Sequence, residues 1–279
     1  MLIMLVGFVI ILLIVGMFMQ SKLKSLLRYY TGQQVTQHAK VLSDLLDEKF
    51  TVELTCLEHI SIFIEKGVVN KENLLEVFEE MEHCSGIGLL ELGGKSVYGE
   101  SLSIKEFSGI QDSFRGNSAI SYSPEKGLLF TVPVYSNENV RYVLYKFYEN
   151  ELLSEAFSIS CYDGAGSVFI TNRNAEVIIP TENRELEQFL FSNSGVKKVY
   201  EQIQKELNIM TATSARYERE DGFYYLFVSE IGVTDFLLVG TVPREIVSEG
   251  MTHITVLIWW VFGLLLLLLA IIFVFLFGA

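Results

Sequence analysis

Hydrophobic and polar residues divide this chain into three zones, and the two outer zones carry no charge. Every Asp, Glu, Lys and Arg lies between Lys22 and Glu249. The runs Met1–Met19 and Ile254–Ala279 consist mainly of apolar residues. A helix of about 20 apolar residues can cross the hydrocarbon core of a bilayer. The pattern therefore predicts a two-pass protein of the cell membrane, with a transmembrane helix in residues 1–20, a connector and second transmembrane helix in residues 244–279, and residues of about 21–253 extracytoplasmic.

The first outer zone could also be a signal peptide. The residues that follow it, Phe18 to Lys22, make a poor cleavage site because they lack the small-x-small pattern. We therefore expect an uncleaved anchor. No charge precedes the first apolar run or follows the second, so we also expect the chain to be a piece of a longer protein.

Between Ser21 and Lys66, apolar residues recur at steps of three and four, which predicts a long helix with one apolar stripe. We expect residues 21–66 to form a stalk that leaves the membrane. The stripe from Leu42 to Ile64 favours a parallel homodimer through this stalk. The polar stretch Thr31–Gln34 either bends the rod, loosens the dimer seam or forms solvated turns of one continuous helix.

From Gly86 onward the apolar period changes to two, which is the spacing of β-strands. Gly93 and Gly94 separate two such runs and permit a hairpin turn, because glycine adopts positive φ. The order strand–strand–helix–strand–strand–strand then occurs twice, which predicts an α+β fold with two antiparallel sheets. Strands are expected at Gly86–Leu92, Lys95–Tyr98, Ala119–Ser123, Leu128–Tyr135, Val140–Tyr148, Ser167–Thr171, Glu176–Ile179, Thr211–Glu218, Phe223–Ser229 and Phe236–Val242.

Short helices are expected between the strands and before the second apolar run. They lie at Asn70–Cys84, Ile104–Phe114, Arg184–Phe191, Val196–Glu206 and from Arg244 onward. Pro243 stops the last strand and suits the first turn of a helix. The predicted modules are residues 67–160 and residues 161–243.

The composition excludes several classes of function. The formal net charge of −13 lies entirely in the middle segment, which argues against a nucleic-acid partner. Three cysteines, Cys56, Cys84 and Cys161, are too few for a disulfide framework. One bridge or three small core residues are both compatible with the sequence.

The sequence contains no recognisable catalytic or cofactor motif. It has no Gly-rich phosphate loop, no nucleophile elbow and no His-Glu-x-x-His. The pairs Cys56/His59 and His83/Cys84 fit no zinc-finger spacing. We therefore expect no catalytic residue, no metal and no cofactor.

Several stretches of the middle segment resemble the double Cache family, the tandem PAS-like extracytoplasmic sensors of bacterial signalling proteins. Phe114–Ser121 with Leu129–Tyr135 resembles the third and fourth strands of the membrane-distal module. Val143–Phe157 resembles its last strand and the connector that follows. Tyr162–Ile170 and Thr234–Pro243 resemble the opening and closing segments of the membrane-proximal module, although the family usually has Trp where Phe236 stands.

The resemblance implies that a small molecule of unknown identity binds in the membrane-distal module. Binding would regulate a cytoplasmic output domain that is not in this chain, of the diguanylate cyclase or histidine kinase type. In the matching pocket region the candidate ligand-binding residues are Arg115, Tyr122, Tyr135 and Tyr145. Arg can grip a carboxylate and tyrosines offer flat walls with a polar tip. Each of them could equally be a solvated or core side chain.

The sequence departs from the amino-acid-binding members of the family. These carry an Arg-x-Trp pair before the third strand and an Asp on the last strand, whereas Phe147 stands near the Asp position here. A free amino acid held by that motif is therefore not expected. The alternative function is a membrane-anchored structural or adhesion protein with a passive extracellular domain.

Overall fold

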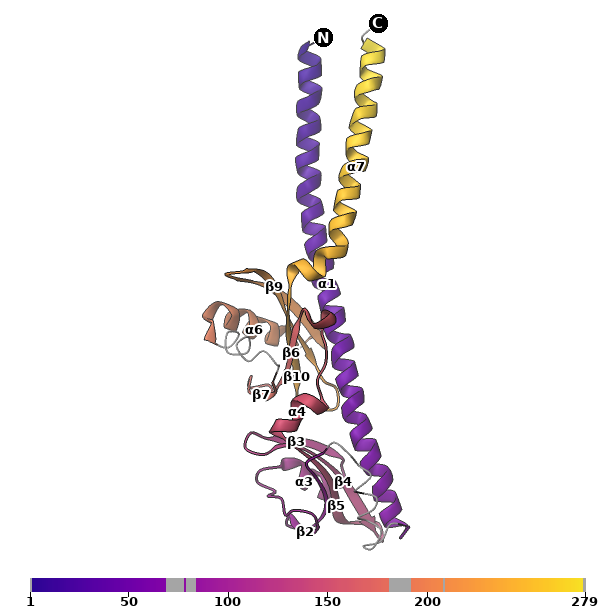
Figure 1. The fold of residues 1–279 in the computed structure, drawn as a ribbon, viewed down its shortest axis with the longest axis vertical. Helices are drawn as coiled ribbons and strands as arrows, with labels where there is room; N and C mark the ends of the chain where they lie inside the picture. Colours follow the sequence, from indigo (N-terminus) through magenta and orange to yellow (C-terminus); the bar gives the residue numbers. More distant parts are fainter. Residues whose placement is uncertain (1, 69–77, 79–83, 181–191, 208, 278–279) are drawn as a thin grey trace.

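The computed structural model describes the chain except residues 1, 69–77, 79–83, 181–191, 208 and 278–279. Its longest element is the helix α1, Leu2–Glu65, which runs along most of the molecule (Figure 1). α1 is continuous through the polar stretch Thr31–Gln34, so the rod is not broken there. The Thr31 hydroxyl donates to the Leu27 carbonyl within the helix at 2.7 Å, so this polar side chain is hydrogen-bonded without a break in the helix.

The first module is a five-stranded antiparallel sheet in the order β2-β1-β5-β4-β3. The predicted hairpin at Gly93 and Gly94 is confirmed, and both glycines have positive φ. The predicted helix at Ile104–Phe114 begins four residues late, because residues 103–107 form a turn. The elements are β1 (Gly86–Glu91), β2 (Lys95–Tyr98), α3 (Ser108–Phe114), β3 (Ala119–Ser123), β4 (Gly127–Ser136) and β5 (Asn139–Glu149).

The second module repeats this plan with the sheet order β7-β6-β10-β9-β8. A short helix, α4, and a connector join the two modules (Figure 1). The elements are α4 (Asn150–Ala156), a 3-10 turn (Tyr162–Gly164), β6 (Ser167–Thr171), β7 (Val177–Ile179), α6 (Ser194–Leu207), β8 (Ala212–Arg219), β9 (Gly222–Glu230) and β10 (Leu237–Pro243). The predicted α+β fold with a long N-terminal helix and two antiparallel sheets is confirmed.

One face of each sheet packs against α1, and this shared layer is the main core. Its members on α1 are Val35, Ala39, Leu42, Leu46, Phe50 and Leu57. The opposite face of the first sheet is covered by α3 and its loops, and that of the second sheet by α6. The stripe that predicted a dimer seam thus buries much of its apolar surface against the chain's own sheets. The sequence alone could not tell whether the stripe packs on a second copy of the helix or on the chain's own sheets, because both kinds of packing require the same spacing of apolar residues.

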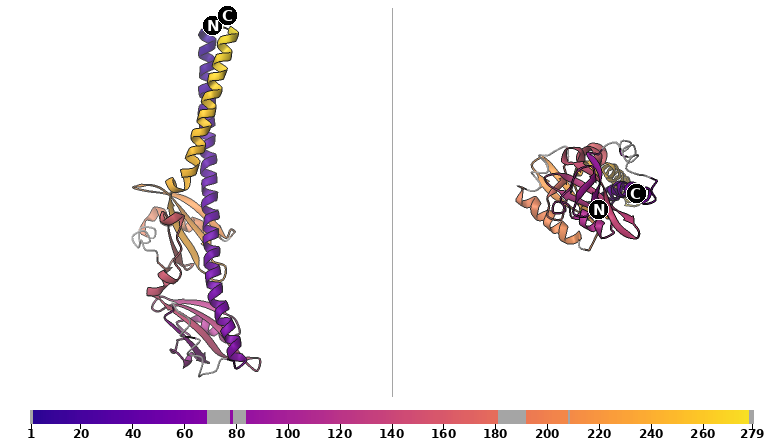
Figure 2. Two further views of the ribbon diagram at one scale, coloured as in Figure 1. Left: turned by 45° about the vertical axis from the view of Figure 1, so that its right-hand side comes forward. Right: turned by 90° about the horizontal axis from the view of Figure 1, so that it is seen from below.

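The last element, α7 (Arg244–Phe277), follows β10 directly and returns alongside the first part of α1. Two views place the chain ends at the same end of the molecule (Figures 1 and 2). A Cβ on Gly16 would lie 3.6 Å from the Phe262 ring, so the helices touch there. Among the residues that were described, no helix meets the length and apolarity needed to cross a membrane. The helices predicted at Asn70–Cys84 and Arg184–Phe191 fall largely or wholly outside the described residues.

Candidate functional site

The face of the first sheet that lies under α3 carries two of the four predicted ligand-binding residues, Tyr135 and Tyr145. On β4 and β5 the side chains of Leu129, Val143, Tyr145 and Phe147 point to this face and pack with Phe107 and Ile110. Successive strand residues point to opposite faces, so Thr131 and Tyr135 share the side of Leu129. This α3 face is the first candidate site.

Tyr145 is a structural part of the α3 face. Its side chain is buried, and its hydroxyl accepts from the Glu100 N–H at 2.8 Å and donates to the Glu100 carbonyl at 3.0 Å. Burial raises the pKa of Tyr145 to about 12. The ring fits because Gly88 leaves space for it, since a Cβ there would lie 2.7 Å from a ring carbon. Tyr145 therefore anchors the loop after β2.

Tyr135 and Arg115 lie together at one end of α3. The Tyr135 hydroxyl donates to the Gly116 carbonyl at 3.3 Å, a long bond that a ligand group can replace. Arg115 ends α3 and forms an exposed ion pair with Asp112 at 3.4 Å. Tyr145 pairs with Thr131, four residues from Tyr135, which is about 13 Å along the strand. Tyr145 and Tyr135 thus lie at two ends of the α3 face, and Arg115 lies beside the Tyr135 end.

Tyr122 does not belong to this face. It pairs with Leu128 on β4, and both side chains belong to the core layer under α1. Burial raises the pKa of its hydroxyl, and the negative charge of Glu176 in the second module adds to the shift. The structure thus separates Tyr122 from the other three candidates and places it near the second module.

A cluster of buried hydroxyls under α3 was not identified from the sequence. The Ser113 hydroxyl donates to Thr131 Oγ1 at 2.8 Å, and Thr131 Oγ1 lies 3.1 Å from the Gly109 carbonyl. Ser121 is buried beside Gly109, and its hydroxyl has no hydrogen-bond partner among the described residues. In the sequence, the only hint of this cluster was Thr131, a polar residue within the apolar run of β4. An unpaired buried hydroxyl costs free energy unless a ligand or water meets it.

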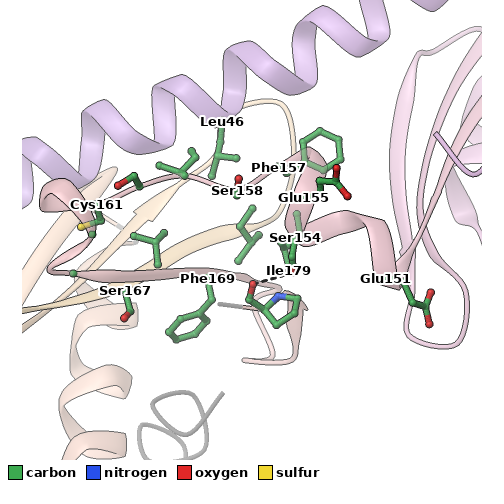
Figure 3. A pocket seen from close by; sticks show the side chains of 17 residues that line it. Leu46, Glu151, Ser154, Glu155, Phe157, Ser158, Cys161, Ser167, Phe169 and Ile179 are labelled. Carbon is green, nitrogen blue, oxygen red and sulfur yellow. Dashed lines mark hydrogen bonds between the residues drawn. The ribbon is translucent and has the colours of Figure 1, made fainter. Parts of the chain in front are cut away.

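A hollow lies between the modules, where the connector passes β6 (Figure 3). This inter-module cleft has a volume of 790 Å³, within the range of small-molecule sites. It is bounded by α4, by connector residues 157–161, by β6, by Ile179 and Pro180 at the end of β7, and by Leu46 of α1. None of the four predicted site residues lines it.

No family model matches the sequence, and no curated protein matches it. Solved structures match the fold. The sensory domain of the Campylobacter jejuni chemoreceptor Tlp3 with isoleucine bound has a TM-score of 0.59 at 13% identity, covering 81% of this chain and 97% of that one. The extracellular domain of mmHK1S-Z2, described as a histidine kinase, has a TM-score of 0.55 at 12% identity, covering 77% and 98%.

Both matches cover more than three quarters of this chain. Its two sheets and the long helix on which they pack are the architecture that the double Cache resemblance implied. At this level of identity the likeness concerns the fold. The chain therefore has the fold of the sensory domains of chemoreceptors and histidine kinases.

Proposed function

We propose that this chain is the extracytoplasmic small-molecule sensing region of a transmembrane signalling receptor that controls a cytoplasmic output domain. The observation that carries the proposal is the architecture. Two sheet modules pack on one uninterrupted helix, and the last strand of the second module leads directly into α7. A displacement in either module therefore changes the position of a helix that reaches the far end of the molecule. The fold likeness to sensory domains supports the same role.

Membrane anchorage through both ends belongs to this proposal. Its support is the absence of charge before Lys22 and after Glu249, together with the contact between α1 and α7 near Gly16 and Phe262. The two sheets would then lie on the extracytoplasmic side, with the first module farther from the membrane than the second.

The α3 face of the first module is the proposed sensory site. It combines an apolar wall with the unpaired Ser121 hydroxyl and with the long hydrogen bond of Tyr135. Tlp3 has been solved with isoleucine, L-valine and L-norvaline. Phe147 lies on the α3 face of this chain, near the position at which the double Cache resemblance implies an Asp in amino-acid-binding members. We therefore propose a largely apolar small molecule rather than an amino acid held by that motif.

Thermal unfolding of the full-length chain, screened against amino acids, carboxylates, amines, purines and sugars, tests this function. A ligand at about 100 times its dissociation constant adds about 2.7 kcal/mol, which raises the melting temperature by several degrees. Tyr135→Ala is expected to abolish that rise without lowering the melting temperature of the free protein, because Tyr135 is only partly buried.

Tyr122→Ala is the matched control on the other face of the sheet and is expected to keep the rise. A ligand response that survives Tyr135→Ala but not Tyr122→Ala would contradict the proposed position of the site. The absence of any response across the whole panel would count against the small-molecule function itself.

We also propose that two copies associate through α1. About 100° around the helix from the buried stripe, α1 exposes a second apolar stripe made of Val41, Leu45, Val52, Cys56 and Phe63. Its steps of four, seven, four and seven residues follow a heptad-like seam. No described element of this chain covers these side chains. A parallel two-fold seam would bring each of them near its own copy.

Cys56 provides a direct test of this association, because it lies on the stripe and its thiol is exposed. Mild oxidation of the chain in membranes is expected to give a disulfide-linked dimer that disappears in Cys56→Ser. Cys161→Ser is the control and is expected to change nothing, since that thiol is buried and burial raises its pKa to about 12. Crosslinking that persists in Cys56→Ser would place the contact elsewhere.

A further inference from the structure

We infer that a hollow between α1 and β8 binds the phosphate group of a ligand through Arg28 of α1 and Arg216 of β8. This α1–β8 hollow belongs to the second module, so the inference concerns a different site and a different class of ligand from the sensory proposal above. It rests on the hollow itself, on two arginines that form no ion pair among the described residues, and on a glycine of α1 that faces open space.

The α1–β8 hollow has a volume of 710 Å³, which suffices for a small polar molecule or a lipid headgroup. One wall is a stripe of α1, and the other is formed largely by β8. Hydrogen bonds join the two walls, because the Ser214 hydroxyl donates to the Gly32 carbonyl at 3.0 Å and lies 2.9 Å from Thr36 Oγ1. The hollow is therefore bounded by elements that are fixed to each other.

Arg28 and Arg216 both line this hollow. In the part of the chain that the structure describes, neither guanidinium group forms an ion pair with a carboxylate. The central carbon of the Arg216 guanidinium lies 3.6 Å from the centre of the Phe223 ring. This stacking occupies one face of the group and leaves the N–H donors, which lie in its plane, available to an anion.

The two arginines lie toward the same end of the hollow, because β8 runs antiparallel to α1. The hydrogen bond between Ser214 and Gly32 gives a common reference point. Arg216 is two residues further along β8, and Arg28 is four residues back along α1, which is about 6 to 7 Å in each case. A single anion at that end can therefore meet both side chains.

Gly32 adds open space to the hollow. It lies inside α1, where glycine is less favourable than every other residue except proline. A Cβ built on Gly32 would meet no atom within 4 Å, so packing does not require a glycine at this position. Any larger side chain would instead extend into the space between α1 and β8.

Two guanidinium groups favour a phosphate over a carboxylate. One guanidinium fork satisfies both oxygens of a carboxylate, whereas a phosphate offers a further oxygen to a second arginine. The Tyr29 hydroxyl accepts from the Gln33 amide at 2.7 Å and keeps its own proton for another contact. The acidic Glu206 lines the hollow near Thr213, three residues and about 10 Å from Arg216 along β8. Its carboxylate suits hydroxyl groups of a ligand such as glycerol phosphate.

Such a phosphate can come from a lipid headgroup or from a soluble compound. Leu26, Tyr29 and Tyr30 are exposed next to Arg28 on α1, and tyrosine is enriched at membrane boundaries. With the membrane anchorage proposed above, the arginine end of the hollow is the end nearer the bilayer. A headgroup bound there would contact both the long helix and the second sheet.

The experiment is calorimetric titration of the full-length chain in neutral detergent, with sodium glycerol 1-phosphate and with phosphatidylglycerol added to the same micelles. We expect saturable binding at low salt. Tighter binding of the lipid would identify a headgroup site, and tighter binding of glycerol phosphate would identify a soluble ligand. Glycerate, which has a carboxylate in place of the phosphate, is expected to bind about tenfold more weakly.

The double variant Arg28→Gln/Arg216→Gln should bind the phosphate compounds about tenfold more weakly, because it loses two charged hydrogen-bond donors. Its matched control is Lys105→Gln/Arg141→Gln, which removes the same charge from exposed positions of the first module and should bind normally. An equal loss in the control would overturn the inference, because it would show attraction by charge in general.

Gly32→Leu adds a steric test. Leucine suits a helix better than glycine, so the melting temperature should not fall, whereas binding should weaken at least tenfold. Binding that is unchanged in Gly32→Leu would place the ligand outside the hollow and overturn the inference. So would the absence of binding of both phosphate compounds at millimolar concentration, or binding of glycerate as tightly as glycerol phosphate.

Discussion

Replacing Glu53 with leucine is expected to destabilise the chain by about 3–5 kcal/mol, because it leaves the Lys146 ammonium buried without a counter-charge. Lys146 Nζ lies 2.7 Å from Glu53 Oε2, and the two side chains are 7% and 22% exposed. The pair joins α1 to the middle of the first sheet, and the ammonium also lies 5.2 Å from the centre of the Tyr148 ring. Thermal unfolding of the full-length chain should show a melting temperature lower by about 10 °C.

Two further variants separate the charge effect from the loss of packing. In Glu53→Leu/Lys146→Met both charges are removed, and stability is expected to recover most of the loss, since apolar residues often replace a buried ion pair without cost. Glu106→Leu breaks the exposed pair with Lys126, whose atoms are 3.4 Å apart, and should cost less than about 1 kcal/mol. A double variant as unstable as Glu53→Leu would show that the packing, rather than the unpaired charge, dominates.

Phe50→Ala is expected to cost about 3–5 kcal/mol and to separate the unfolding of the two modules. Phe50 is fully buried on α1, and its ring contacts three other rings from different parts of the chain. Its centroid lies 5.8 Å from Phe130 of β4, 5.0 Å from Phe157 of the connector and 6.5 Å from Phe236 just before β10. Removing this ring leaves a cavity where the helix, both modules and the connector meet.

Hydrogen exchange of the full-length chain measures this separation directly. In the wild type, amides of the two sheets should share their slowest opening free energy, whereas Phe50→Ala should give two distinct values. Leu92→Ala is the control, because Leu92 is 81% exposed in a turn, and it should change stability by no more than about 0.5 kcal/mol. A uniform loss of protection in Phe50→Ala would mean that the modules are coupled by other contacts.

The elements of the fold were largely predictable from the sequence because their signals are local. Alternation of apolar residues gave both sheets, and the three- and four-residue steps gave α1. The continuity of α1 through Thr31–Gln34 was open at the sequence level. The structure supplies one physical reason, since the Gly32 carbonyl accepts a hydrogen bond from Ser214 of β8 at 3.0 Å. That bond joins residues far apart in the sequence, so no local pattern contains it.

The candidate sites were less predictable because they depend on which strand face each side chain occupies. Tyr122 resembles Tyr135 and Tyr145 in type and spacing, yet its pairing with Leu128 turns it toward α1. That pairing follows from the register between β3 and β4, which the sequence did not specify. The inter-module cleft had no sequence signal, because it depends on how short β7 is and on the path of the connector.

The way α1 serves both modules restricts the chain lengths that this fold can accept. The second sheet is held through Thr36 and Ser43, whose hydroxyls lie 2.9 Å from Ser214 Oγ and 2.7 Å from Ser229 Oγ. The first sheet is held through Glu53 and its partner Lys146. One residue inserted between Ser43 and Glu53 would turn one docking face by about 100° relative to the other.

Seven inserted residues would turn it by only about 20°, although they would also move the modules apart. The rotation along α1 between its two docking faces thus couples the positions of two sheets that share no strand. We expect natural length changes in this stretch of α1 to occur in whole heptads, accompanied by matching changes in the connector. Hairpin loops such as Ser136–Asn139 face no such restriction, because no second docking surface depends on their length.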